Sequence, residues 1–114
     1  MSDCLFCKMI AGEIPADVVY EDDQVFAFRD INPQAPTHVL VVPKTHVATL
    51  NDLDGASAPL MGALFLGAKR VAEQEGIAEV GYRTVVNCNE DAGQTVFHIH
   101  VHVLGGRRMQ WPPG

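Results

Sequence analysis

Residues 98–104 read His-Ile-His-Val-His-Val-Leu, the stretch in which polar and apolar side chains alternate most strictly. Successive side chains of a β-strand point to opposite faces, so His98, His100 and His102 are expected to share one face and the aliphatic residues the other. Imidazole titrates near neutral pH and can act as a nucleophile, an acid, a base or a metal ligand. The stretch therefore predicts a strand over 96–104 that carries a candidate active site. The alternative is a half-buried strand whose solvent-facing side is merely rich in histidine.

Four more strands and one long helix can be placed outward from this stretch. Runs typical of strands, bounded by turn residues, lie at 18–21, 24–30, 38–43 and 82–87. The run at 38–43 is almost entirely branched and apolar, which is typical of a central strand buried on both faces. Apolar residues recur at helical spacing from Ser57, a possible cap, to Glu75, just before Gly76. Hairpins grouped around one long helix indicate an α+β fold with an antiparallel sheet.

Shorter segments complete the expected organisation. Residues 5–11 predict a short helix, closed by Gly12. Residues 32–36 predict a loop, because two prolines remove two donors from any strand ladder. The polar residues 89–94 are expected to form a flexible link, and the tail at 105–114 shows no periodicity.

The composition limits the kind of protein. A chain of 114 residues suits one domain with one core. Its 8 basic and 14 acidic residues give a net charge of −6, which argues against broad binding to nucleic acid or an anionic membrane. No stretch approaches the ~20 apolar residues of a membrane span, and the N-terminus does not resemble a secretion signal. Because the three cysteines cannot all pair, a disulfide framework is not expected, and the cytoplasm is the expected location.

The cysteines and histidines also predict a metal site. The rise of a strand separates His98 from His102 by ~13 Å, so one ion cannot bind all three histidines of the row. Cys4 and Cys7, two residues apart, can present two thiolates to a tetrahedral zinc ion, with His46 and His98 as third and fourth ligands. A redox pair or buried cysteines without a metal are the alternatives.

The pattern at 98–104 resembles the H-φ-H-φ-H-φ-φ signature of the histidine triad (HIT) family of nucleotide hydrolases and transferases, where φ is apolar. Other segments resemble the Hint branch of that family, the purine nucleoside phosphoramidases: 14–16, 21–23, 28–31, 33–38, 43–46, 81–83, 86–87, 93–96 and 105–114. The resemblance covers nearly the whole chain. It implies a single HIT domain over 1–114, with a five-stranded antiparallel sheet, one long helix and one short helix. It also implies a homodimer with a ten-stranded sheet, in which the tail at 105–114 reaches the partner's active site.

The resemblance assigns roles to the histidines. His100 resembles the nucleophile that attacks the α-phosphorus of a nucleoside 5′-phosphoramidate, giving a nucleotidyl-histidine that water then hydrolyses. His102 would lie beside the phosphate and assist the leaving group, and His38 would support His100 from the adjacent strand. His98 resembles the first triad histidine, which faces the metal in members with Cys-x-x-Cys. The chemistry requires one imidazole nitrogen to be available for attack while the other is held as a donor.

The resemblance also implies nucleotide contacts. Asp30 matches the position that binds the ribose hydroxyls, and Phe6, Ile14, Phe28 and Ile31 resemble the apolar walls around the purine. The other matching positions are Asn87, Gly93, Gln94, Thr95, Val96 and Trp111. The turn at 93–95 could expose backbone N–H groups to a phosphate, with a threonine hydroxyl where the branch usually has serine. A plain loop, a turn-closing asparagine and a mobile tail are the alternatives for these last positions.

These observations predict an enzyme that hydrolyses adenosine or guanosine 5′-phosphoramidates, binds AMP- or GMP-type nucleotides and uses no metal in the reaction. A nucleotidyl transferase is one alternative, although transferases of the family generally carry glutamine where this chain has His102. A diadenosine polyphosphate hydrolase is another. A zinc-binding interaction module without catalytic activity is the third.

Overall fold

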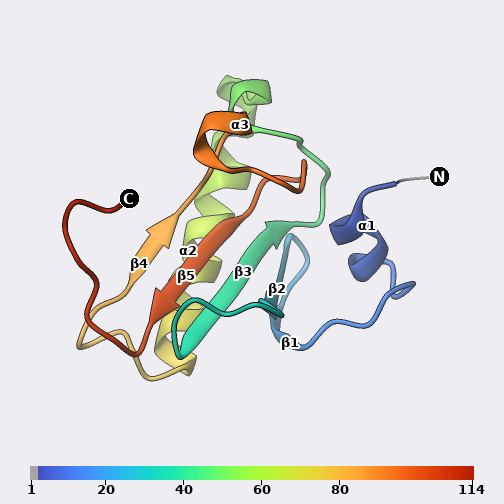
Figure 1. Ribbon diagram of the computed structural model, residues 1–114. Coiled ribbons are helices and arrows are strands. Elements are labelled where there is room, and N and C mark those ends of the chain that lie inside the picture. The colour runs from blue at the N-terminus through green and yellow to red at the C-terminus, as the bar shows by residue number, and fades with distance from the viewer. Residues whose placement is uncertain (1–2) are drawn as a thin grey trace.

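An antiparallel sheet of five strands organises residues 3–114, the part of the chain that the computed structural model describes (Figure 1). The strand order is β1-β2-β3-β5-β4, with bounds β1 Val18–Glu21, β2 Val25–Arg29, β3 Thr37–Pro43, β4 Arg83–Val85 and β5 Val101–Gly105. The helices are α1 Leu5–Ile10, α2 Ala58–Gln74 and α3 Asn89–Ala92, and the 3₁₀ turns η1 Leu50–Asp52 and η2 Gly55–Ser57 precede α2. The predicted α+β fold, with one long helix and one short helix at the N-terminus, is confirmed.

The central strand is β3, as its composition predicts. It pairs with β2 on one side and with β5 on the other, so that Val41 lies opposite both Ala27 and Val101. Every residue of β3 is buried. A strand flanked by two neighbours and covered on both faces needs apolar side chains in both directions, which explains its nearly continuous run of branched residues.

The pleat of the sheet divides its side chains between two cores. The core beneath α2 is aliphatic and consists of Val25, Ala27, Val39, Val41, Leu64, Ala68, Val71, Ala72, Ile77, Ile99, Val101 and Val103. On the other face, Phe6 of α1 packs with Phe26, Phe28, Leu40 and Val42. Figure 1 shows α2 crossing behind the sheet, whereas α1 stands beside the end of β3. The histidines lie on the face that α1 covers.

Helix α2 contacts the sheet through the predicted spacing of apolar residues, with Leu64, Ala68 and Val71 fully or almost fully buried. Gly67 lies where the helix comes close to the sheet: a Cβ on this residue would stand 3.0 Å from Cγ1 of Val25.

No helix within residues 3–114 has both the length and the apolar character needed to span a bilayer.

The strand predicted over 96–104 begins later than expected, at Val101. In the register of β3 and β5, Ile99 would face Pro43, which has no N–H to donate to the ladder. The N–H of Ile99 instead donates to the carbonyl of Val47 at 2.7 Å. The alternation of side chains survives this change, because Ile99, Val101 and Val103 all pack beneath α2. The predicted strand was therefore too long, while the predicted division of its residues between two faces holds.

Candidate active site and metal centre

His100 is held with one ring nitrogen as a donor. Its Nδ1 lies 2.8 Å from the backbone carbonyl oxygen of His98. A carbonyl can only accept, so the neutral ring carries its proton on Nδ1 and has a lone pair on Nε2. The ring is buried, and Phe6 packs against it edge-on at 5.2 Å between ring centroids. This is the tautomer that a nucleophilic Nε2 requires.

A chain of hydrogen bonds fixes the other two imidazoles. The backbone N–H of Gln34 donates to Nδ1 of His38 at 3.0 Å, so a neutral His38 carries its proton on Nε2. That Nε2 lies 2.9 Å from Nδ1 of His102, which accepts, and His102 therefore carries its own proton on Nε2. The Oδ2 atom of Asp30 is 3.5 Å from Nε2 of His38. Support of His100 by His38 is thus indirect, because His38 contacts His102, whose ring packs against that of His100 at 5.0 Å.

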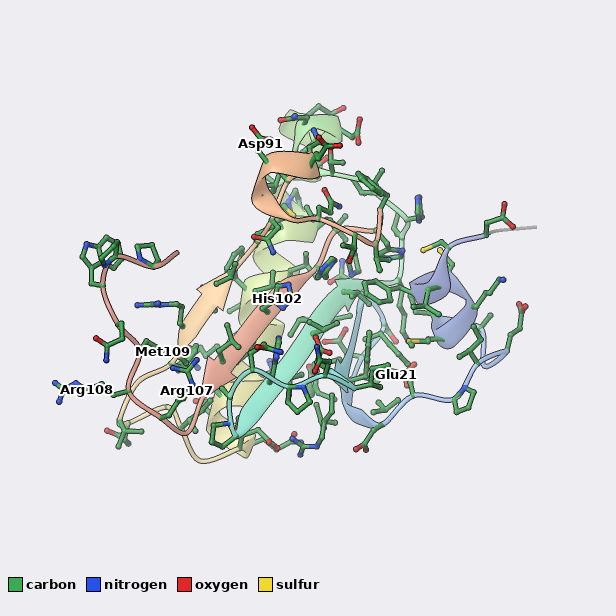
Figure 2. All side chains as sticks on the ribbon, in the orientation of Figure 1. Glu21, Asp91, His102, Arg107, Arg108 and Met109 are labelled. Atoms are coloured by element: carbon green, nitrogen blue, oxygen red, sulfur yellow. The ribbon has the colours of Figure 1, made fainter. Side chains whose placement is uncertain are left out.

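All three rings are biased toward the neutral form. Burial lowers the pKa of His38 and of His100 below the usual imidazole value. The hydrogen bond to the carbonyl of His98 partly opposes this at His100, and the carboxylate of Asp30 does so at both rings. Burial, with smaller contributions from His100 and His38, lowers the pKa of His102 to about 4. Figure 2 shows His102 over the middle of the sheet, on β5. At neutral pH the site therefore offers an unprotonated nitrogen on His100 and a neutral N–H donor on His102.

A cavity of about 320 Å³ opens beside these rings. It is lined by His100 and His102 together with six of the expected nucleotide contacts, Phe6, Phe28, Asp30, Ile31, Thr95 and Val96. Four further lining residues were not predicted: Leu5, Met9, Arg29 and Leu40. Periodicity could have found two of them, because Met9 lies three residues after Phe6 on a helix and Leu40 lies two residues after His38 on a strand.

The other expected nucleotide contacts lie outside this cavity. Asn87 lines a neighbouring cavity of about 250 Å³ that also touches His38 and His102. Ile14 is half-buried, and Trp111 lies on the C-terminal tail with 81% of its surface exposed. Neither residue lines either cavity.

The predicted phosphate-binding turn at 93–95 is formed differently from the expectation. Residues Asn89–Ala92 are helical rather than a flexible link, and Gly93 ends this helix with a φ of 88°. The N–H groups of Gly93 and Gln94 donate to carbonyls of α3, to those of Glu90 and Asn89 respectively. The side chain of Gln94 accepts from the N–H of Asn89 and donates to two more carbonyls. These groups hold the loop together, and of this turn only Thr95 lines the larger cavity.

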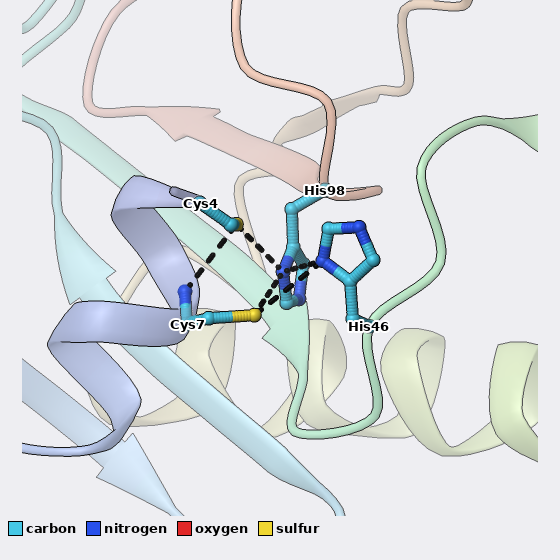
Figure 3. Close-up of side chains that lie close together, drawn as sticks. All are labelled: Cys4, Cys7, His46 and His98. Carbon is cyan, nitrogen blue, oxygen red and sulfur yellow. Dashed lines mark hydrogen bonds between the residues drawn. The ribbon is translucent and has the colours of Figure 1, made fainter. Parts of the chain in front are cut away.

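The four predicted metal ligands converge at one point (Figure 3). Cys4 and Cys7 come from the start of α1, His46 from the loop after β3, and His98 from the segment before β5. Nδ1 of His98 lies 3.3 Å from Sγ of Cys4, 3.5 Å from Sγ of Cys7 and 3.1 Å from Nδ1 of His46. Sγ of Cys7 is 3.4 Å from Nδ1 of His46.

These separations fit a tetrahedral metal. Ligand bonds of about 2.3 Å to sulfur and about 2.0 Å to nitrogen give tetrahedral edges of about 3.5 Å from sulfur to nitrogen and about 3.3 Å between nitrogens. Nε2 of His98 lies 2.8 Å from the carbonyl of Pro43, so its proton sits on Nε2 and Nδ1 can coordinate. The two thiolates and two imidazoles are the donor set that zinc prefers in structural sites.

Three comparisons with known proteins agree with this geometry. A sequence model of the HIT domain matches residues 11–109. The purine nucleoside phosphoramidase of Escherichia coli is 51% identical over 107 residues, which are 94% of this chain and 90% of that protein. The crystal structure of a HIT family hydrolase from Legionella pneumophila superposes with a TM-score of 0.96 at 55% identity, covering 98% of this chain and 100% of the other.

A third relative bears on the metal centre. The crystal structure of a zinc-bound histidine triad family protein from Mycobacterium smegmatis has a TM-score of 0.77 and 37% identity, over 92% of this chain and 76% of that one.

The family match spans most of the chain, and the similar proteins match it almost from end to end. The chain therefore belongs to the HIT domain family and is one of its hydrolases.

Proposed function

We propose that this hydrolase cleaves the P–N bond of purine nucleoside 5′-phosphoramidates through a nucleotidyl-histidine on His100. The observation that carries the proposal is the 2.8 Å contact between Nδ1 of His100 and the carbonyl of His98, which leaves Nε2 available at the edge of a cavity. The similarity to the phosphoramidase of Escherichia coli supports the same substrate class. A cavity of about 320 Å³ is also within the usual size for small ligands.

In the first step, Nε2 of His100 attacks the α-phosphorus while the bond from phosphorus to the amine nitrogen breaks. The departing amine takes a proton from His102. The site takes up that proton with the substrate, because an anionic phosphate beside His102 favours the charged form of its ring. Nδ1 of His102 then donates to Nε2 of His38, whose own proton moves to Nδ1, and the hydrogen bond from the N–H of Gln34 to that atom opens. The products of this step are the free amine, a neutral His102 and a nucleotide bonded to Nε2 of His100.

In the second step, water attacks the same phosphorus and the bond to His100 breaks. The water proton returns to His102, which is now a base, and a nucleoside monophosphate leaves. His100 regains its original tautomer, because Nδ1 keeps its proton and donates it in a hydrogen bond to the carbonyl of His98 throughout. His38 takes part by holding Nδ1 of His102, which orients the proton-carrying nitrogen of that ring.

The remaining contacts are assigned on the geometry of the cavity. Asp30 accepts from the ribose hydroxyls, and Thr95 donates its hydroxyl to the phosphate. The purine lies between the apolar side chains Phe6, Phe28, Ile31 and Val96. Asn87 contacts the phosphate from the neighbouring cavity, whereas Ile14, Gly93 and Gln94 act through the surrounding structure.

The protein is also proposed to bind zinc and to form a homodimer in the cytoplasm. Cys4, Cys7, His46 and His98 would hold the zinc ion as a structural group, and no reaction step runs through it. Phe65 and Leu66 leave 43% and 60% of their surfaces exposed on α2, which is an apolar face that a second copy could cover. In such a dimer the tail, with Trp111, would reach the partner's cavity. Light scattering should give the mass of two chains.

Trapping the intermediate tests the proposed reaction. Protein quenched with acid during turnover of adenosine 5′-phosphoramidate should carry a nucleotide on the peptide that contains His100, as measured by mass spectrometry. The His100→Gly variant should carry no nucleotide on this peptide, because it lacks the attacking nitrogen. If the wild type forms product and no adduct appears on it, the covalent mechanism is wrong.

A further inference from the structure

Helix α1 takes part in both the metal centre and the nucleotide cavity. Cys4 and Cys7 supply two of the four metal ligands. Phe6, between them, lines the cavity and packs edge-on against the rings of His98 and His100. Met9, on the next turn, lines the cavity as well. One side of α1 therefore faces the metal ligands while another forms a wall of the cavity.

The helix has few other means of holding its position. It is six residues long, and isolated helices shorter than about 12 residues are unstable in water. Phe6 is its one buried residue, and Met9 and Ile10 pack, partly buried, against the same apolar cluster. A metal bound by the two thiolates would add a second kind of attachment, at the start of α1.

His98 is anchored differently. It is completely buried, and its Nε2 lies 2.8 Å from the carbonyl of Pro43. Its own carbonyl accepts a hydrogen bond from Nδ1–H of His100. Because these contacts involve only the protein, His100 keeps its position whether or not the four ligands hold a metal.

We propose that Cys4, Cys7 and His46 are positioning residues for the nucleotide cavity: joined through a metal, they hold α1 so that its side chains close the wall against the nucleoside. The inference rests on the proposed function and on the proposed zinc site. Metal occupancy then sets the affinity for the nucleotide, whereas the rate of the chemical step changes little. The difference arises because the wall depends on the metal ligands and the nucleophile depends on Pro43 and His98.

The test uses His46→Ala, because His46 supplies a metal ligand but does not line the cavity. Thr45→Ala is the matched control, since Thr45 is the adjacent exposed residue and belongs to neither site. We would measure zinc content, the Kd for AMP by calorimetry, and KM and kcat with adenosine 5′-phosphoramidate. Hydrogen exchange at the α1 amides reports directly on the position of the helix.

His46→Ala without zinc should raise both Kd and KM about tenfold or more, leave kcat within about threefold, and speed exchange in α1. Thr45→Ala should match the wild type in every measurement. Phe6→Ala provides a second variant: because the wall is already lost, removing zinc from it should no longer change Kd. This non-additivity distinguishes positioning of the wall from a general loss of stability.

Three results would overturn the inference: a chain that binds no zinc, an unchanged Kd for AMP after verified zinc loss, or a fall in kcat with Kd unchanged. Failure of the proposed function gives a different result. In that case the zinc-loaded wild type would bind no AMP at all, whereas failure of this inference leaves AMP binding equally with and without zinc.

Discussion

The two faces of the sheet are built by different means from the same strands. Beneath α2, side chains such as Val39, Val41 and Leu64 pack with no polar partner required. On the α1 face, the side chains that alternate with them include His38 and His102, whose rings are joined by a hydrogen bond across 64 residues of sequence. One face depends on shape and apolar area, and the other on specific pairs of polar atoms.

This difference separates stability from chemistry. Apolar burial is non-directional, so the α2 face can hold the fold together without placing any single atom accurately. Buried imidazoles must instead be satisfied, and within residues 3–114 every buried side-chain nitrogen or oxygen has a partner. Those partners determine which ring nitrogens carry protons, and this determines what the site can do.

The largest effect is expected on the α1 face, on activity alone. His100→Gly removes the proposed nucleophile and should lower kcat/KM with adenosine 5′-phosphoramidate by about 10³-fold or more. Steady-state kinetics measures this, and urea denaturation should show that the variant remains folded. Wild-type rates in His100→Gly would show that the mechanism is assigned to the wrong residue.

The α2 face should give the opposite result. Leu64 is completely buried, and Leu64→Ala should lower the free energy of unfolding by about 2–5 kcal/mol while kcat of the folded protein stays near the wild-type value. Lys69→Ala, on the exposed side of the same helix, is the control and should cost about 0.5 kcal/mol or less. A large fall in kcat for Leu64→Ala would mean that the two faces are coupled.

The sequence predicts the α2 face well, because its signals are local. The 3.6-residue spacing of Leu64, Ala68 and Val71 and the apolar run of β3 each indicate a buried surface without knowledge of any partner. The convergence of Cys4 and Cys7 with two histidines was also predictable, since the ligand chemistry of zinc restricts the choice.

The sequence predicts the α1 face less well, because its details depend on distant residues. The start of β5 is determined by Pro43 on the neighbouring strand, which alternation at 96–104 cannot indicate. The ring that His38 contacts is likewise determined by register, which places His38 opposite Leu104 and diagonal to His102. The N–H groups at 93–94 could be assigned to α3 only once that helix was seen.

The pH dependence of stability should also differ between the faces. In the unfolded chain His102 titrates near 6.5, whereas burial and its two neighbouring histidines hold its pKa at about 4 in the folded protein. Between these values the unfolded state binds more protons, so stability falls as the pH falls. The loss from this residue should reach about 3 kcal/mol at pH 4.

Urea denaturation of the wild type and of His102→Asn, at several pH values from 7.5 to 4, measures this effect. Over that range the free energy of unfolding of the wild type should fall by about 3 kcal/mol more than that of His102→Asn. The difference arises because the variant lacks the imidazole whose protonation favours the unfolded state. Leu64→Ala, which removes no titratable group, should give a curve parallel to the wild type. A parallel curve for His102→Asn would mean that burial of this ring does not oppose its charge.

A smaller effect is expected where the α2 face is most tightly packed. A Cβ on Gly105 would lie 2.5 Å from Cδ1 of Ile77, so Gly105→Ala should cost about 1–3 kcal/mol in thermal or urea denaturation. Adding Ile77→Val should recover part of this loss. Gly62→Ala is the control, since a Cβ there meets nothing within 4 Å, and alanine in a helix should stabilise by up to about 1 kcal/mol. Equal results at Gly105 and Gly62 would show that the contact with Ile77 yields easily.

The smallest effect concerns the ion pair that joins the sheet to the end of α2. The guanidinium of Arg29 binds both carboxylate oxygens of Glu75, at 2.7 and 3.0 Å, in a geometry that favours strong pairing. The side chain of Arg29 is nevertheless 40% exposed, so solvent screens the pair. A double-mutant cycle of Glu75→Gln and Arg29→Gln should therefore give a coupling energy of about 0.5–1 kcal/mol. A coupling energy above about 2 kcal/mol would mean that this polar contact stabilises the fold as much as the burial of an apolar side chain does. The α2 face would then depend on specific polar pairs as well as on apolar area, and the contrast between the two faces would be lost.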